Sequence, residues 1–374
     1  MRSRLILSLL AASLAGLAGC SSTPAKPDPT PLKDFKAEFN IAPAWSFSLG
    51  EVKGPLSASV HGSRVVLASS TGHVVMLDGR NGQAVWQIKL DAPIQAGVGG
   101  DGQRFALVNA RNEVVTLQDG KVLWRHAMPA TTLTAPLVAG GRVFVMTADR
   151  AVTALDGASG RELWRYEHRG SDALVLRQAG LLMPVGNTLI AGLGGRMVAL
   201  DPDQGRVGWE VAVGAIRGTN EVERLVDLVN PAARDGRTVC ARAFQSSVAC
   251  VDTAQARVLW SKSAQGYQGL DMDESHVFAV EGDDKVQALA RDDGQQSWLQ
   301  DGLRFRGLTA PRVLGRSVVV GDEQGYVHFL SRKDGHVLQR LSTDGSAIAM
   351  VPVLVEQTLV VVTRQGQVRA FNAQ

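Results

Sequence analysis

Residues 74–86 read VVMLDGRNGQAVW, and the same order of residues returns at 152–164 (VTALDGASGRELW) and 197–209 (MVALDPDQGRVGW). Each stretch has an apolar strand, an Asp, a turn containing Gly and, four residues after that Gly, a Trp. Gly adopts the positive φ that a tight turn needs, and a polar side chain before it can bond to the backbone. The pattern therefore predicts a β-hairpin whose second strand carries the Trp.

The hairpin recurs along the whole chain. All seven tryptophans hold the same place in it, and neighbours are 38 to 51 residues apart, the period of a four-stranded propeller blade: Trp45, Trp86, Trp124, Trp164, Trp209, Trp260 and Trp298. Gln339 lies 41 residues after Trp298 and holds this place in an eighth unit. A Gly stands four residues earlier in six units, and Ala256 replaces it before Trp260.

The two ends of the chain complement each other. The last unit, from Pro352 to Phe371, supplies three strands, and residues 44–49 (AWSFSL) supply a Trp strand without the other three. Pairing the two ends would close a ring and remove its free edges. We therefore predict an all-β, eight-bladed β-propeller of four-stranded antiparallel blades over residues 41–374. An open solenoid, or a seven-bladed ring with a loose Trp45 segment, is the alternative.

The first 40 residues differ from the rest. Arg2 and Arg4 precede an apolar stretch at 5–14 that is too short to span a membrane, and residues 17–20 read LAGC. This resembles a bacterial lipobox, which implies a signal peptide over 1–19 and lipidation of Cys20; an ordinary secretory signal with a chance cysteine is the alternative. The residue after Cys20 is Ser21 and not Asp. By the same resemblance, this implies sorting to the outer membrane. Four prolines follow by residue 31, so residues 20–40 are expected to form a flexible, extended tether.

Composition argues against several functions. The 374 residues carry a formal charge of only +3, with no run of Lys or Arg, which argues against binding of nucleic acid. The three cysteines are not adjacent, and the seven histidines lack metal-binding spacing. The three tyrosines are too few to form a sugar-binding platform, because the repeat uses every Trp.

The Asp-x-x-x-Gly-x-x-x-Trp pattern resembles the repeat of pyrroloquinoline-quinone enzymes. That resemblance would imply a vicinal disulfide, a calcium site and a catalytic Asp, and the cysteine pattern does not match it. We therefore expect no catalytic residue, metal or cofactor. A periplasmic pyrroloquinoline-quinone-dependent dehydrogenase remains the alternative function.

Two stretches interrupt the repeat. Residues 173–177 (ALVLR) lengthen the unit between Trp164 and Trp209 to 45 residues, and residues 220–229 (NEVERLVDLV) belong to the longest unit, 51 residues. Leucines two apart on an extended segment face the same side, so a protruding loop here would present an apolar anchor beside a basic residue. The alternatives are an inner strand of the ring for the first stretch and a solvated charged loop for the second.

From Pro31 onward the chain resembles the BamB family of lipoproteins, which belong to the outer-membrane β-barrel assembly machinery. The resemblance rests on residues 44–46 (AWS), on residues 320–328 (VGDEQGYVH) and on the two interruptions. It implies a non-catalytic scaffold, lipid-anchored at the outer membrane and facing the periplasm. The scaffold would bind POTRA domains of the barrel-forming subunit BamA and assist insertion of β-barrel proteins. Direct contact with unfolded barrel proteins is a further interaction that the resemblance leaves open.

The same resemblance implies which residues bind the partner. The family's Leu-x-Leu-Arg loop and its Arg-Leu-x-Asp segment match six positions: Leu174, Leu176, Arg177, Arg224, Leu225 and Asp227. Val229 replaces a second acid of the family pattern. Asp227 is expected to orient Arg177 or to receive a charge of the partner.

Cys240 and Cys250 lie symmetrically about a turn expected at Gln245. Opposed cysteines on neighbouring strands can reach disulfide distance, and the periplasm is oxidising. The sequence leaves two possibilities open, a disulfide or two buried thiols, and either one is structural.

Overall fold

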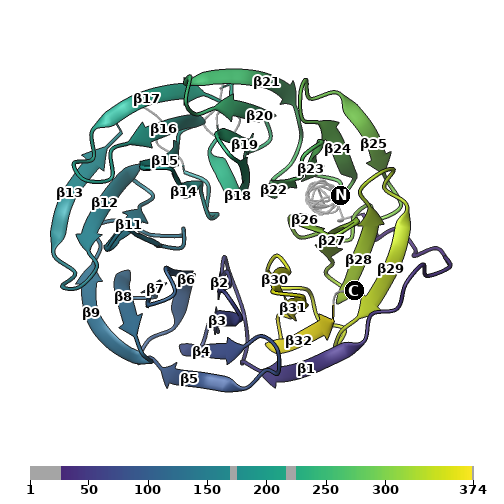
Figure 1. The fold of residues 1–374 in the computed structure, drawn as a ribbon, viewed down its shortest axis with the longest axis horizontal. Helices are drawn as coiled ribbons and strands as arrows, with labels where there is room; N and C mark the ends of the chain where they lie inside the picture. The colour runs from purple at the N-terminus through teal and green to yellow at the C-terminus, as the bar shows by residue number, and fades with distance from the viewer. Residues whose placement is uncertain (1–26, 169–174, 216–224, 373–374) are drawn as a thin grey trace, which may run out of the picture.

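The computed structural model describes residues 27–168, 175–215 and 225–372, which form eight four-stranded antiparallel sheets arranged in a ring (Figure 1). This confirms the predicted eight-bladed β-propeller. Within the described ranges, no helix has the length and apolar character needed to cross a membrane.

The strands of each blade follow in chain order from the centre of the ring to its rim. Blades 1 to 4 comprise β2 (Ser59–His61), β3 (Arg64–Ala68), β4 (His73–Asp78) and β5 (Ala84–Lys89); β6 (Ile94–Gly100), β7 (Arg104–Asn109), β8 (Glu113–Gln118) and β9 (Lys121–Ala127); β10 (Leu137–Ala139), β11 (Arg142–Met146), β12 (Ala151–Asp156) and β13 (Glu162–Glu167); and β14 (Leu182–Val185), β15 (Thr188–Leu193), β16 (Arg196–Leu200) and β17 (Val207–Ala212). Blades 5 to 8 comprise β18 (Leu228–Asp235), β19 (Thr238–Ala243), β20 (Ser247–Asp252) and β21 (Arg257–Ser263); β22 (Leu270–Met272), β23 (His276–Val280), β24 (Val286–Ala290) and β25 (Gln296–Gln300); β26 (Arg312–Leu314), β27 (Ser317–Gly321), β28 (Tyr326–Ser331) and β29 (Val337–Ser342); and β30 (Val353–Val355), β31 (Thr358–Val362), β32 (Gln367–Asn372) and β1 (Pro43–Ser48).

The ring closes through its two ends. The first strand, β1, pairs with β32 as the outermost strand of blade 8, with Trp45 opposite Ala370 and Phe47 opposite Val368. This confirms the predicted closure and excludes both alternatives, the open solenoid and the seven-bladed ring. The middle strands β3, β4 and their counterparts are almost fully buried, so the core is a continuous band around the ring.

Six of the seven tryptophans reach the next blade, where each covers a turn that contains Gly. The ring of Trp124 lies so close to Gly160 that a β-carbon on this Gly would be 2.6 Å from it, and its Nε1 donates to the Gly157 carbonyl at 3.0 Å. Gly160 also has a φ of +72°. The turn therefore needs Gly for its backbone conformation and for the absence of a side chain. The other pairs are Trp45 with Gly82, Trp86 with Gly120, Trp164 with Gly205, Trp260 with Gly294 and Trp298 with Gly335.

Gln339 is the exception, and ring closure explains it. Blade 8 takes its third and fourth strands from opposite ends of the chain, so it has no turn there for an indole to cover. The Gln339 amide instead donates to the Phe39 carbonyl. Phe329, which pairs with Gln339 across the blade, packs edge-on against Phe39, with ring centroids 5.9 Å apart. Two phenyl rings thus occupy the junction between blades 7 and 8, where Gln339 replaces the Trp of the other units.

The chain before β1 is bound to blade 7, in contrast to the expected free tether over residues 20–40. Glu38 donates its backbone N–H to the carbonyl of Leu338 at 3.0 Å, and Thr30 donates likewise to Arg304 at 3.0 Å. This segment, residues 27–42, is the dark purple strap beside β29 in Figure 1. The structure differs from the expectation here because three apolar or aromatic side chains of this segment contact the ring. Arg340 lies over the ring of Phe35, 4.9 Å from its centroid, and Phe39 and Ile41 pack on the core of blade 7. The proline-rich composition gave no indication of these contacts.

The stretch 320–328 ties this strap to the ring. Asp322 is fully buried and accepts hydrogen bonds from Arg306 Nε at 2.8 Å and from His328 Nε2 at 2.9 Å. Burial alone would raise the pKa of Asp322, but the hydrogen bond and charge of His328, together with Arg306, hold this pKa below its ordinary value. Arg306 also donates to the Thr30 carbonyl at 3.1 Å, so the buried carboxylate orients the residue that holds the strap.

Cys240 and Cys250 face each other on β19 and β20, directly opposite in the register, and the structure joins them by a disulfide. Gln245 lies in the turn between these strands with a φ of 45°. Both cysteines are fully buried, so the bond is part of the core of blade 5.

The Trp–Gly contact predicts an unequal response of two glycines to the same substitution. Gly186 has a φ of +57° and nothing within 4 Å of an added β-carbon, whereas Gly160 faces Trp124. Gly186→Ala should lower the free energy of unfolding by only about 1 kcal/mol, the cost of a left-handed Ala. Gly160→Ala should lose roughly 1–3 kcal/mol more, because the indole must move. Equal losses in urea unfolding would contradict the contact.

Thiol labelling tests the disulfide between Cys240 and Cys250. A Cys20→Ser variant leaves only Cys240 and Cys250. After export to the periplasm and denaturation, both cysteines should resist alkylation until a reductant is added, because the oxidising compartment forms the bond. Alkylation of both without reductant, read by mass spectrometry, would show two free thiols instead.

Candidate functional site

The two interruptions of the repeat meet in space. The first precedes β14 and the second precedes β18, and they are joined by backbone hydrogen bonds between 179–181 and 228–230: Leu181 N–H to the Leu228 carbonyl at 3.0 Å and Asn230 N–H to the Ala179 carbonyl at 3.0 Å. Gly180 and Val229 form an antiparallel bridge between them. The two interruptions therefore form one local structure at the inner ends of blades 4 and 5. They lie far apart in the sequence, since Leu176 and Asp227 are separated by 51 residues.

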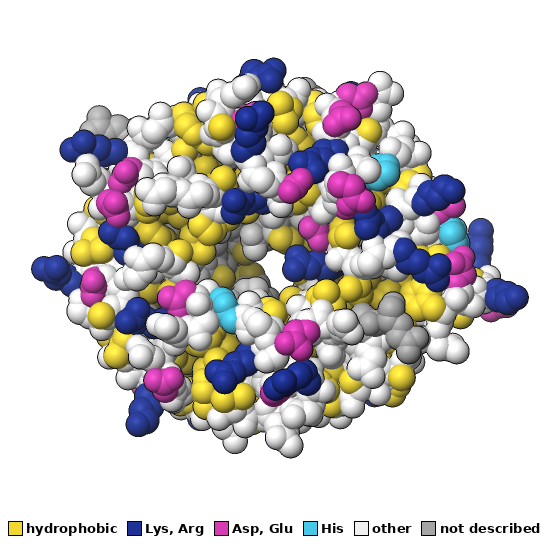
Figure 2. Space-filling model, viewed as in Figure 1, with side chains coloured by type: hydrophobic (Ala, Val, Ile, Leu, Met, Phe, Trp, Pro, Cys, Tyr) yellow, Lys and Arg dark blue, Asp and Glu magenta, His cyan; other side chains and the backbone are white. Residues whose placement is uncertain are grey.

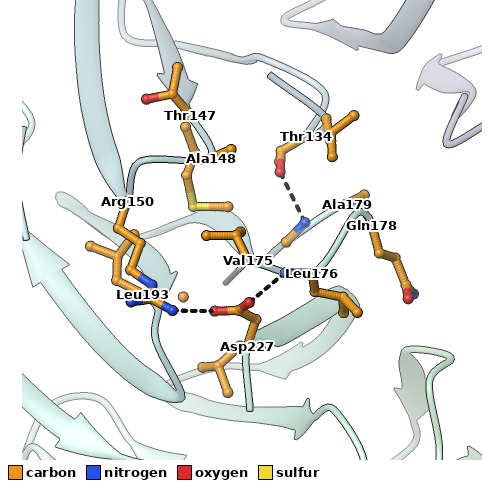
Figure 3. A pocket seen from close by; sticks show the side chains of 15 residues that line it. Thr134, Thr147, Ala148, Arg150, Val175, Leu176, Gln178, Ala179, Leu193 and Asp227 are labelled. Carbon is orange, nitrogen blue, oxygen red and sulfur yellow. Dashed lines mark hydrogen bonds and ion pairs between the residues drawn. The ribbon is translucent and has the colours of Figure 1, made fainter. Parts of the chain in front are cut away.

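Asp227 is the polar centre of this structure. Its Oδ2 accepts the backbone N–H of Leu176 at 2.9 Å, and its Oδ1 lies 3.7 Å from Arg150 Nη2 (Figure 3). The side chains of Asp227 and Arg150 are only 14% and 10% exposed. Asp227 therefore fixes the backbone beside Arg177. That it also orients the Arg177 side chain stays a prediction. Arg177 is exposed.

Further contacts from other blades hold the first interruption. Gln178 Nε2 donates to the Tyr267 carbonyl at 2.6 Å, and Gly180 N–H donates to Thr134 Oγ1 at 2.9 Å. Leu176 is half-buried and lines a small cavity of about 40 Å³ beside Asp227, as Figure 3 shows. The segment 175–181 is thus anchored to blades 3, 5 and 6 although it contains no strand of its own.

The remaining predicted residues are placed only in part. Leu174 and Arg224 lie outside the described residues, and Leu225 is half-buried at the start of the second segment. The alternative of an inner strand does not hold for Leu176, because β14 begins only at Leu182. Sequence reasoning missed Gln178, which directly follows the first interruption, and also Arg150 and Thr134, which belong to the regular units. These three residues are recognised only through their contacts.

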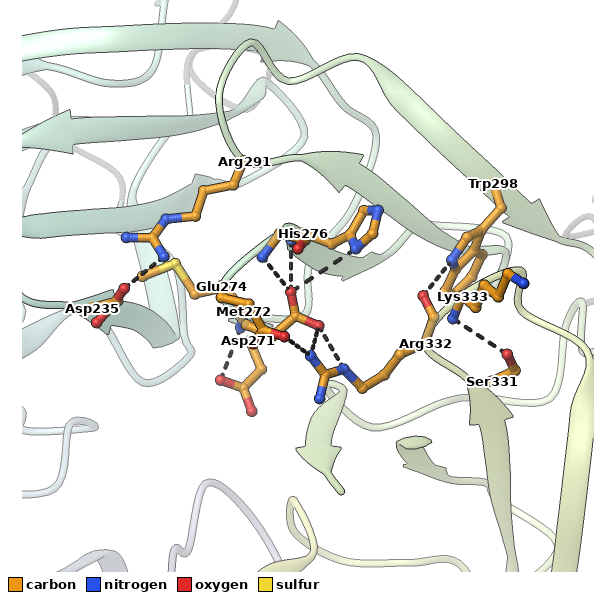
Figure 4. Close-up of polar contacts among 12 residues, drawn as sticks. Asp235, Asp271, Met272, Glu274, His276, Arg291, Trp298, Ser331, Arg332 and Lys333 are labelled. Carbon is orange, nitrogen blue, oxygen red and sulfur yellow. Dashed lines mark hydrogen bonds and ion pairs between the residues drawn. The ribbon is translucent and has the colours of Figure 1, made fainter. Parts of the chain in front are cut away.

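A second polar cluster, between blades 5, 6 and 7, is structural. Arg332 Nε donates to Asp273 Oδ2 at 2.6 Å and Nη2 to Glu274 Oε1 at 2.9 Å, and Arg291 pairs with Asp235 at 2.5 Å (Figure 4). The carbonyl of Arg332 also accepts the Trp298 Nε1–H at 2.9 Å. These charges are paired with one another across blade boundaries. No group of three or more His, Cys, Asp or Glu side chains in the described part of the chain is placed to hold a metal.

The centre of the ring is hollow. Figure 2 shows the central opening, with Lys and Arg interspersed among Asp and Glu on this face of the molecule. A cavity of about 590 Å³ is lined by the segments that connect successive blades, with Arg312, Glu323 and Arg364 as its charged residues. Mixed charge and small apolar side chains favour no particular ligand here. The exposed Arg177 on its anchored segment is the more specific feature.

Comparison with known proteins places this chain in a family. The protein-family model described as "Outer membrane protein assembly factor BamB" matches residues 43–96 and 70–300. A protein of Burkholderia pseudomallei (strain K96243) with that name is 37% identical over 368 residues, which cover 97% of this chain and 96% of that protein.

Two solved structures have the same fold. The crystal structure of BamB from Moraxella catarrhalis has a TM-score of 0.81 at 24% identity, covering 89% of this chain and 100% of the other. A quinohemoprotein alcohol dehydrogenase from Comamonas testosteroni has a TM-score of 0.70 at 13% identity, covering 89% of this chain and 76% of the enzyme. At this identity, the likeness to the enzyme is one of fold alone.

Proposed function

Because this chain belongs to the family of the outer membrane protein assembly factor BamB, we propose that it is a non-catalytic scaffold of the outer-membrane β-barrel assembly complex. It acts at the outer membrane on the periplasmic side, binds POTRA domains of BamA and assists the insertion of β-barrel proteins. Its work is to position partners, with no bond made or broken.

The observation that carries this proposal is the anchored segment 175–181. Its backbone donates to Asp227 and Thr134, and its Gln178 side chain donates to the Tyr267 carbonyl, while Arg177 points into solvent. A segment fixed before binding loses less conformational entropy when a partner docks, so more of the contact energy appears as affinity. A half-buried Leu beside an exposed Arg combines an apolar contact with directional hydrogen bonding, the residue chemistry of a binding hot spot.

The lipid anchor sets the distance over which the scaffold works. We assign the lipid to Cys20, at the end of the signal peptide 1–19. Since the strap is bound to blade 7 from Thr30 onward, only residues 21–29 separate the lipid from the ring. Such a segment reaches roughly 30 Å when fully extended. This short tether keeps the ring close to the membrane surface and raises its effective concentration for membrane-bound partners.

The alternative, a pyrroloquinoline-quinone-dependent dehydrogenase, gains no support from the cysteines. The disulfide of this chain joins residues separated by 10 positions, on two paired strands inside blade 5. The resemblance to the quinoprotein enzymes would require two adjacent cysteines facing a cofactor. The relatives that share most of the chain are named as assembly factors.

Binding of purified POTRA domains of BamA tests the proposal. Replacing Leu174, Leu176 and Arg177 together by Ala should weaken binding at least tenfold, the effect of removing a hot spot of about 2 kcal/mol. The melting temperature should change by no more than about 2 °C, since Arg177 is exposed and Leu176 is only half-buried. Surface plasmon resonance and calorimetry provide the two readouts.

The matched control removes similar side chains elsewhere. Lys121 and Leu123 are exposed on β9 of blade 2, far from the interruptions in the sequence. The Lys121→Ala, Leu123→Ala variant should bind as the wild type does. Undiminished binding by the triple variant would refute the assignment of this site.

A further inference from the structure

The turn between the second and third strands of every blade contains a residue with positive φ. Blades 1, 7 and 8 place Gly there, whereas blade 3 places Arg150, with a φ of 60°. A left-handed conformation costs a residue with a β-carbon about 1–2 kcal/mol, and Arg lacks the short polar side chain that lets Asn tolerate it. Strain of this kind is often found at functional positions, so the contacts of Arg150 are informative.

Two other blades show what a side chain at this position does. In blade 2, Asn112 binds the segment that leads to blade 3: its Nδ2 donates to the carbonyls of Met128 at 3.0 Å and Ala130 at 2.6 Å, and its Oδ1 accepts the N–H of Thr132 at 3.0 Å. The side chain at this position therefore points at the connection to the next blade and fixes its backbone.

Blade 6 repeats this arrangement with a carboxylate. Asp284 accepts the N–H of Gly307 at 2.7 Å and of Leu308 at 3.0 Å, both in the segment that leads to blade 7. Asn112 and Asp284 have φ values of 59° and 63°, close to that of Arg150. In both blades, a residue in the left-handed conformation clamps the outgoing connection.

In blade 3 the outgoing connection is the first interruption. Its backbone starts as in blade 2: His168 N–H donates to the Arg150 carbonyl at 3.2 Å, as Met128 N–H does to the Asn112 carbonyl at 3.0 Å. Arg150 is 8% exposed, and its Nη2 lies 3.7 Å from Asp227 Oδ1. The other oxygen of Asp227 accepts the Leu176 N–H at 2.9 Å. The clamp of blade 3 therefore acts through a carboxylate contributed by the second interruption.

We propose that Arg150 is a positioning residue for partner binding, which acts through Asp227 to fix the backbone that carries Leu176 and Arg177. The inference rests on the proposed function, because it assumes that this segment meets the partner. The positive charge of Arg150 holds the largely buried Asp227 carboxylate in place, and that carboxylate holds the segment. Without Arg150 the segment gains freedom, which a partner must remove on binding at a cost in affinity.

The decisive variant is Arg150→Gly. Gly is the residue that blades 1, 7 and 8 use at this turn, at Gly72, Gly325 and Gly366, so the backbone is compatible with the exchange. We expect the variant to keep its melting temperature and to bind the POTRA domains of BamA about tenfold more weakly. Arg150→Lys, which keeps the positive charge, should recover part of the lost affinity.

Asn112→Gly is the matched control, since it makes the same exchange in a blade whose outgoing connection carries no interruption. Its affinity for the POTRA domains should equal that of the wild type. In the free protein, hydrogen exchange of the peptide containing Leu176 should be faster in Arg150→Gly and unchanged in Asn112→Gly. Wild-type exchange and affinity in Arg150→Gly would overturn the inference.

The outcomes separate this inference from the proposed function. If the Leu174, Leu176 and Arg177 triple variant loses binding while Arg150→Gly keeps it, the clamp is wrong and the binding site stands. If both variants keep full affinity, the assigned binding site itself is wrong.

Discussion

The contact between an indole and a glycine turn of the next blade is the interaction on which the ring depends. A β-carbon on Gly160 would lie 2.6 Å from Trp124, so only Gly lets the indole reach the turn and bind its backbone carbonyl. Burial of one indole contributes roughly 5 kcal/mol, at about 25 cal/mol per Å² over about 200 Å². Because these contacts join neighbouring blades around most of the ring, they give the rigid frame from which an irregular segment can be presented.

The regular part of this frame could be predicted because the two residues of each contact stand in a fixed local pattern in the sequence. The Gly and Trp of one blade lie four residues apart, although each contacts a different neighbour, so the spacing alone counts the blades. The strap before β1 could not be predicted in this way. Its partners Leu338 and Arg340 lie about 300 residues further along the chain, and they become neighbours only when the ring closes. The reason for Gln339 likewise appears only once the missing turn of blade 8 is seen.

The candidate site could likewise be predicted from the sequence only in part. The two interruptions were recognised as departures from the repeat, and residues were assigned to them by resemblance. Their mutual contact could not be predicted, because it depends on blades 4 and 5 lying side by side: Gly180 bridges to Val229, and Asp227 turns inward to the Leu176 amide. The sequence contains one signal for Arg150, because an Arg stands in a turn where blades 1, 7 and 8 have Gly. Its meaning required the comparison with Asn112 and Asp284 in the folded ring.

A rigid ring with one specialised segment makes a direct prediction about where the partner lies. Hydrogen exchange of the whole protein, measured with and without the POTRA domains of BamA, tests it. We predict protection of residues 175–181 and 225–230, with no change in blades 7 and 8, which lie across the ring (Figure 1). Protection confined to blades 7 and 8 or to the strap, with 175–181 unchanged, would contradict the account.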